Sequence, residues 1–264
     1  MKTKLHLPII INLCFFTLFS FAQENHNQNQ VTGTWVRMTQ TGPVALQFKP
    51  NGKVEVDFGA DQTIDVVTEY KIDNNTIRFI DGEGAMCPEP GVYTFEKNED
   101  YLAFDLIEDM CNGRIKMTMG FWTKSNFQEI LTKLSQKISS TKNPELNLTR
   151  ARIFIATGKP MEAKADLDIY LKHNTGDASA YINRAGTRFP ADMEGAVNDC
   201  NNAIALEPDN KNAFFLRGLA LYELGEKEKA CEDFNRAIEL GFSILRIAEE
   251  HRCSEYWYQE KDKH

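Results

Sequence analysis

The stretch that decides the fold of the second half of the chain is AFFLRGLALYELGEKEKACEDFNRAIELG, residues 213–241. From Asn126 onward, apolar residues recur with a period of 3.6, which is typical of helices. Related stretches precede residue 213 at intervals of 33–34 residues. A repeat of that length indicates an array of short helical units rather than one globular core.

Small and large residues alternate at fixed offsets in each copy. The third copy has Phe214, Gly218, Leu221, Gly225, Ala230, Phe234 and Ala237; the second has Tyr181, Ala185, Ala196, Cys200, Ala203 and Pro208; the first has Ala151, Gly158, Ala163, Leu167 and Tyr170. This pattern resembles the tetratricopeptide repeat (TPR), which implies two antiparallel helices per unit and a concave groove that recruits a protein partner. On this resemblance, residues 145–253 hold three repeats, closed by a capping helix at Ser243–Arg252.

The first half of the chain has a different period. Between Val31 and Thr123, eight short segments alternate apolar with polar residues, and turn formers such as Pro50-Asn51-Gly52 separate them. Such a series predicts an antiparallel meander, and closure into a barrel removes its exposed edges. We therefore expect a two-domain chain, with an all-β, eight-stranded up-and-down barrel over residues 31–124 followed by the all-α array. Residues 125–144 supply a helix and a linker.

The barrel segment begins with Gly33-Thr34-Trp35 and is followed by a helix from Asn126. Together with eight up-and-down strands, these features resemble the lipocalin-like barrels of the calycin type. In that family the tryptophan closes the barrel floor beneath a basic residue that follows the last strand. The resemblance assigns the latter role to Lys124.

The first 22 residues have the pattern of a signal peptide. Lys2 and Lys4 precede an apolar run from Pro8 to Phe21, and Ala22 supplies a small residue at the cleavage position. We expect removal of this segment, export to the periplasm or outside the cell, and no membrane span in the mature chain. The net charge of −8 and the absence of any run of basic residues argue against nucleic-acid binding.

Export makes disulfides the default for the five cysteines that follow the signal. Cys87 and Cys111 lie in rim loops at the same end of the barrel, so we expect them to be bonded. Cys231 and Cys253 lie at similar distances from the turn between two antiparallel helices, which predicts a second bond. Cys200 replaces a large core residue and is expected to be a buried, inert thiol.

Strand alternation predicts which side chains point into the barrel near its longer loops, Gly59–Ile64, Asp81–Gly91 and Glu108–Gly113. They are Met38, Leu46, Phe58, Val66, Phe79, Tyr93, Leu106 and Met117. Two interpretations stay open: these residues line a site for a small hydrophobic ligand, or they fill the barrel as its core. The acidic residues of the rim match no calcium loop, so we expect no metal site and no cofactor.

The concave face of the repeats is the second candidate site. Its expected residues are Leu148, Arg152, Ile182, Phe215, Leu219 and Tyr222. This apolar groove suits an extended or helical protein segment, but the barrel or the helix from Asn126 to Ile138 would fill it equally well.

Catalysis needs reactive groups within reach of one another, and the sequence offers no such pattern. The histidines that follow the signal (His26, His173, His251 and His264) lie outside the barrel and have no metal-ligand spacing. Motifs such as GxSxG and HExxH are absent from the sequence. We therefore expect an exported, non-catalytic binding or scaffold protein. The alternatives are a small-ligand carrier whose repeats only dock the barrel and, further off, a hydrolase that uses the acidic rim.

Overall fold

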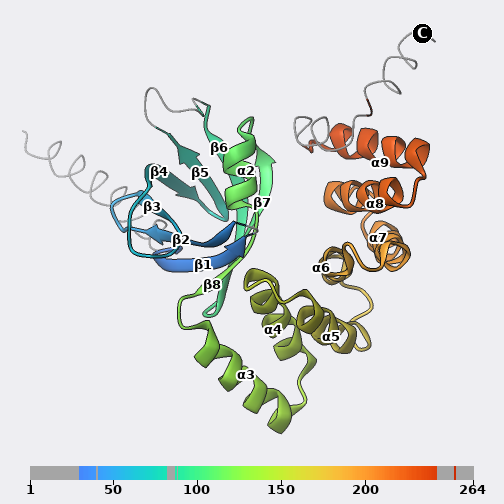
Figure 1. The fold of residues 1–264 in the computed structure, drawn as a ribbon, viewed down its shortest axis with the longest axis horizontal. Coiled ribbons are helices and arrows are strands. Elements are labelled where there is room, and N and C mark those ends of the chain that lie inside the picture. Colours follow the sequence, from blue (N-terminus) through green and yellow to red (C-terminus); the bar gives the residue numbers. More distant parts are fainter. Residues whose placement is uncertain (1–29, 40, 82–86, 88, 243–252, 254–264) are drawn as a thin grey trace, which may run out of the picture.

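The computed structural model describes residues 30–39, 41–81, 87, 89–242 and 253. A closed antiparallel β-barrel comes first in the chain, and an array of antiparallel helices lies to one side of it (Figure 1). This arrangement confirms the predicted fold class. The predicted signal peptide and the predicted capping helix lie outside the described residues.

Eight strands form the barrel, and each pairs with its neighbours in chain order. They are β1 (Gly33–Thr39), β2 (Gly42–Phe48), β3 (Lys53–Phe58), β4 (Val66–Asp73), β5 (Thr76–Ile80), β6 (Gly91–Lys97), β7 (Tyr101–Glu108) and β8 (Gly120–Lys124). Closure depends on a short seam, because β1 meets β8 only through Trp35 opposite Lys124 and Val36 opposite Thr123.

Trp35 forms the floor of the barrel. Its side chain is fully buried, and its indole Nε1 donates a hydrogen bond of 2.8 Å to the carbonyl of Val31. The ammonium of Lys124 lies 3.5 Å from the ring centroid, a cation–π contact. Lys124 therefore occupies the position that the sequence resemblance assigns to it.

Alternation of apolar and polar residues predicts the eighth strand at Arg114–Trp122, and this prediction is wrong over its first half. Residues Asn112–Thr118 form a short helix, α2, and β8 begins only at Gly120. Ile115 of α2 is fully buried in the barrel core, and Met117 and Met119 pack against the same core. Arg37 on β1 donates to the carbonyls of Lys116 and Met119, so a side chain takes the place of the missing strand pairing. An alternating apolar pattern over so few residues fits either structure.

Side chains fill the barrel. The core holds fourteen strand residues together with Val31 and Ile115, and rings such as Phe79 and Tyr93 meet edge to face at 5.7 Å between centroids. Buried members from the strands are Trp35, Val44, Leu46, Phe48, Val54, Tyr70, Ile72, Ile77, Phe79, Tyr93, Leu102, Phe104, Leu106 and Trp122. Trp122 is fully buried, so its neighbour Phe121 points outward, where its ring centroid lies 6.1 Å from that of Tyr101.

Helix α3 (Phe127–Thr141) leads from the barrel into the array. Its residues Leu131 and Leu134 pack against Ile153 on the first helix of the repeats. The helices of the array are α4 (Pro144–Ala156), α5 (Pro160–Leu171), α6 (Ala178–Arg188), α7 (Met193–Leu206), α8 (Lys211–Glu223) and α9 (Lys227–Glu239). They pack as the pairs α4–α5, α6–α7 and α8–α9.

Glycine is required where the two helices of the third pair cross. A Cβ atom on Gly218 of α8 would lie 2.5 Å from the ring of Phe234 on α9, closer than real contacts allow. The fully buried ring of Phe234 fills the space that the glycine leaves. This contact explains why a small residue faces a large one at a constant offset.

Each helix pair is also joined by the same ion pair. Arg150 of α4 binds Asp166 of α5, and the corresponding pairs in the next two units are Arg184–Asp199 and Arg217–Asp233. The carboxylate is buried in all three, and the guanidinium reaches it with two nitrogens. Paired donors and acceptors of this kind satisfy a buried charge that would otherwise be costly.

Candidate functional site: a cleft between the barrel and the repeats

The outer face of β6, β7 and β8 forms one wall of a cleft. Its outward side chains lie in two rows across the strands: Thr94 opposite Asp105, and Glu96 opposite Ala103, which in turn faces Phe121. Ala103 is the smallest of these, so the wall is hollow between a carboxylate on one side and an aromatic ring on the other.

Helices α6 and α8 form the opposite wall. Ser179, Ile182 and Asn183 come from α6, and Asn212, Phe215 and Leu216 come from α8. Phe242 closes the end of this wall and stacks on Phe215 with 4.3 Å between ring centroids. The two walls enclose a cavity of about 570 Å³, lined by apolar rings and side-chain amides.

Arg152 of α4 anchors one end of the cleft. Its Nη1 lies 2.8 Å from Oε1 of Glu96 and also reaches the hydroxyl of Tyr101. The guanidinium lies 4.8 Å from the centroid of Tyr101 and 5.6 Å from that of Phe121, so it stacks on the barrel wall as well. Burial raises the pKa of Tyr101, and its hydrogen bond to Glu96 raises it further.

Lys211, the first residue of α8, anchors the other end. Its ammonium donates a hydrogen bond of 2.5 Å to the carbonyl of Leu106 on β7. Burial lowers the pKa of Lys211, while the charge of Asp105 opposes that effect. The barrel is therefore fixed to both the first and the third helix pair, and the cleft lies between these two contacts.

Asp105 is one of three acidic residues that line the cleft, with Glu96 and Glu207. Water reaches its carboxylate, but protein on both walls limits hydration, and this burial raises its pKa. Lys211 lowers the pKa of Asp105 and Glu96 raises it, so the two neighbours partly offset each other. The amide of Asn212 approaches Asp105 at 3.5 Å, the limit of a hydrogen bond.

The predicted groove residues have different positions. Ile182 and Phe215 line the cleft. Leu148 is buried between α4 and α5, and Arg152 is used in the contact with the barrel, so neither is free in an open groove. Leu219 and Tyr222 pack against the cluster around Phe234. The sequence left open whether the barrel or the helix from Asn126 to Ile138 covers this face of the repeats. In the structure the barrel covers part of it, and α3 packs against Ile153 of α4 instead.

The predicted mouth of the barrel is closed rather than open. Leu46, Phe79, Tyr93 and Leu106 are at most 5% exposed and belong to the packed core, and Met117 lies on the helix that covers it. Met38, Phe58 and Val66 are 43–47% exposed. Met38 points outward because Trp35, three residues earlier on β1, points inward, and side chains an odd number of residues apart lie on opposite faces of a strand. Phe58 and Val66 lie at the ends of their strands, beyond the packed layers.

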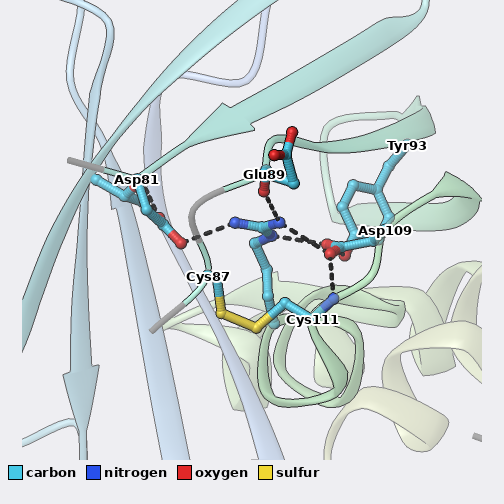
Figure 2. Close-up of a disulfide and its surroundings, with 8 residues drawn as sticks. Asp81, Cys87, Glu89, Tyr93, Asp109 and Cys111 are labelled. Carbon is cyan, nitrogen blue, oxygen red and sulfur yellow. Dashed lines mark hydrogen bonds and ion pairs between the residues drawn. A yellow bond between two sulfur atoms is a disulfide. The ribbon is translucent and has the colours of Figure 1, made fainter. Parts of the chain in front are cut away.

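A disulfide and an arginine hold the closing helix in place (Figure 2). Cys87 is bonded to Cys111, the N-cap of α2, with a Cα–Cα distance of 5.6 Å. Arg114 donates to Asp109 at 2.6 and 2.8 Å and to Asp81 at 2.7 Å. Burial lowers the pKa of Arg114, but the hydrogen bonds and charges of these carboxylates outweigh burial and raise it. Asp81 and Asp109 therefore act as structural partners of an arginine.

The other rim acids shape loops. Asp57 accepts backbone N–H groups of residues 61 and 62, and Asp65 accepts that of Phe58. Among the residues that the structure describes, no group of three His, Cys, Asp or Glu side chains is arranged to hold a metal ion. In the same part of the chain, no helix has the length and apolar character needed to cross a membrane.

The second predicted pair is also bonded: Cys231 of α9 is joined to Cys253, with a Cα–Cα distance of 5.8 Å. Cys200 is fully buried in α7, and burial raises its pKa to about 12. A thiol with so high a pKa is protonated at neutral pH, which makes it a packing residue.

Sequence reasoning missed the barrel side of the cleft. Alternation places Asp105 outward, but neither it nor Glu96, Ala103 and Lys211 was predicted to line a site. One signal was available: Tyr101 lies on the outward side of its strand, and an outward aromatic residue indicates that another element covers that face.

Comparisons with known proteins concern the helical half. Residues 212–241 match the family model of the tetratricopeptide repeat. Tetratricopeptide repeat protein 36 of Xenopus tropicalis is 41% identical over 74 residues, which cover 26% of this chain and 37% of that protein. The chain thus matches well under half the length of this relative.

Two solved structures are similar to part of the chain. A crystal structure of MamA protein is 23% identical, with a TM-score of 0.43 over 44% of this chain and 64% of that chain. The second TPR of Spaghetti, bound to an HSP90 peptide, is 27% identical, with a TM-score of 0.35 over 42% of this chain and 98% of that chain. The family model thus identifies a tetratricopeptide repeat at residues 212–241, and the curated relative is similar to this chain over 74 residues.

Proposed function

We propose that this chain is an exported, non-catalytic binding protein that holds a segment of a protein partner in the cleft between its barrel and its repeats. Tetratricopeptide repeats form scaffolds for protein–protein interaction, and their concave faces are the usual contact surfaces. The observation that carries the proposal is the cavity of about 570 Å³ that remains between the concave helices and the barrel wall.

The lining of the cleft suits a polypeptide. Phe121, Phe215 and Phe242 offer flat apolar surfaces, while the amide of Asn212 offers both a donor and an acceptor. An extended segment presents backbone N–H and C=O groups along its length and side chains on alternate faces. Side-chain amides can hydrogen-bond to the backbone groups of such a segment, and aromatic rings can pack against its side chains.

The barrel acts in this proposal as a wall rather than as a container. Its interior is occupied by packed side chains and covered by α2, which argues against a carrier of small hydrophobic ligands. Recovery of a small apolar molecule bound to the purified protein, identified by native mass spectrometry, would restore the carrier hypothesis.

Export is part of the proposal. The signal-like pattern of residues 1–22 supports it, and so do two disulfides, which persist mainly outside the reducing cytosol. Mass spectrometry of the protein purified from its own cells checks this point. We expect an N-terminus near Gln23, and an intact N-terminus with reduced cysteines would contradict export.

Site-specific photocrosslinking in living cells tests the binding function. A photoreactive residue at Leu216 faces the cleft, and the same residue at the exposed position Lys172 is the matched control. We expect a defined crosslinked species from position 216 that is absent from position 172. It should also disappear when Ala103→Trp fills the cleft. Equal crosslinking from both positions would refute the cleft as the binding site.

A further inference from the structure

The charged side chains of the cleft differ in how well they are paired. Both cations near it have partners: Arg152 pairs with Glu96, and Lys211 donates to the carbonyl of Leu106. Asp105 has only the amide of Asn212 at 3.5 Å, with the charge of Lys211 nearby. On the rim, Glu207 adds a third carboxylate. The cavity is therefore short of positive charge.

The helical wall contains a side-chain amide that lacks a hydrogen-bond acceptor. Within the described part of the chain, Nδ2 of Asn183 is shielded from water and has no hydrogen-bond acceptor. This amide lines the same cavity as Asp105. A buried donor without a partner costs free energy, and rotation of the Asn183 side chain toward the cavity would let a backbone carbonyl of a bound segment accept from it.

We propose that the cleft selects a segment that carries a lysine or arginine, whose cation pairs with Asp105 while an adjacent apolar side chain packs on Phe121 and Phe215. This inference rests on the proposed function and adds the chemistry of the partner. Asp105 supplies the selectivity, because Glu96 is already neutralised by Arg152.

The environment of Asp105 supports this assignment. Asp105 is an exposed residue that lies on the cleft wall, so a cation in the cleft can reach its carboxylate. Protein on the facing wall raises the pKa of Asp105, and an added cation would lower it again by favouring the ionised form. Hollow space over Ala103 leaves room for the long aliphatic part of such a side chain.

Selection from a displayed library of random peptides tests the inference on the full mature chain. Peptides that bind the wild-type protein but not Ala103→Trp define the set that uses the cleft. We expect lysine and arginine to be enriched in this set and aspartate and glutamate to be depleted. Ile182→Trp fills the cleft from the opposite wall and defines the same set if Ala103→Trp fails to fold, as judged by circular dichroism.

A charge reversal then identifies the selecting residue. Asp105→Lys should lower the affinity for the recovered basic peptides by about tenfold or more and should shift selection toward acidic peptides. Glu108→Lys makes the same charge change three residues along β7, outside the cavity lining, and should alter affinity by less than about twofold. Equal effects of the two reversals would overturn the assignment to Asp105.

The outcomes separate this inference from the proposed function. Cleft-dependent peptides without enrichment of basic residues would refute the charge selectivity and leave the cleft as a binding site. A library that yields no peptide sensitive to Ala103→Trp or Ile182→Trp would count against both.

Discussion

Asp199 provides the sharpest test of the ion pairs that join the helices. Its carboxylate is fully buried and binds two arginines, with Oδ1 at 2.5 Å from Arg184 and Oδ2 at 2.8 Å from Arg188. Asp199→Asn keeps the size of the side chain but removes the charge and turns one acceptor into a donor. Both guanidinium groups are only 15–16% exposed, so they would face an amide in a poorly hydrated space.

The magnitude follows from this geometry. Removing one partner of a buried pair costs about 3–5 kcal/mol. Because Arg184 and Arg188 keep their outer partners Asp168 and Asp192, we expect the lower end, about 3 kcal/mol. With a typical urea dependence of about 2 kcal/mol per molar, the unfolding midpoint of the helices should fall by about 1.5 M.

Urea titration with two probes measures the effect. Ellipticity at about 222 nm follows the helices, whereas tryptophan fluorescence in a Trp257→Phe background, which keeps Trp35 and Trp122, follows the barrel. The control is Asp209→Asn, which breaks the exposed pair with Arg236 and should cost less than about 1 kcal/mol. The reasoning is refuted if Asp199→Asn shifts the helical midpoint no further than this control does.

Three further predictions concern the barrel and its contact with the repeats. Gly91→Ala would place a Cβ 2.1 Å from Oδ2 of Asp109, so we expect a loss of about 1–3 kcal/mol in barrel stability by tryptophan fluorescence; an unchanged midpoint would contradict the close approach. Replacing both Cys87 and Cys111 by serine opens a crosslink over 24 residues and should cost about 3 kcal/mol in urea unfolding, compared with the wild-type protein under oxidising conditions. For Asp105, the folded-state pKa is raised, so the folded protein binds more protons than the unfolded one, and stability falls as pH rises above the ordinary aspartate pKa of 3.8. Asp105→Asn should flatten this fall in pH-dependent unfolding, and a parallel pH profile would argue against it.

The repeats were predictable because their pattern reports local packing. The small residue at Gly218 and the ring of Phe234 lie on consecutive helices, and the corresponding residues share a core cluster in the first unit (Ala151 and Leu167) and in the second (Ala185 and Cys200). The strands of the barrel were predictable for a similar reason, since alternation records which side faces a core. The resemblance to lipocalin-like barrels also implied the contact between Lys124 and the ring of Trp35.

What escaped prediction depends on contacts between distant segments. The helix α2 is fixed by Arg37, about eighty residues earlier in the chain, and by the Arg114 network. The choice between Phe121 and Trp122 as the inward residue has no local signal, because the two are adjacent and both are large aromatics. The cleft joins Asp105 to Asn212 across a separation of 107 residues, which no pattern in either half records.

The two anchors of the barrel have a mechanical consequence. A helical repeat array is an elastic arc that can tighten or relax by small rotations between its units. Arg152 and Lys211 attach the barrel to the first and the third helix pair, so the barrel bridges the two ends of the array. An increase or a decrease in the curvature of the array would break one of these two contacts. The curvature of the array is therefore fixed when the chain folds, and binding of a partner does not have to include the entropic cost of fixing it.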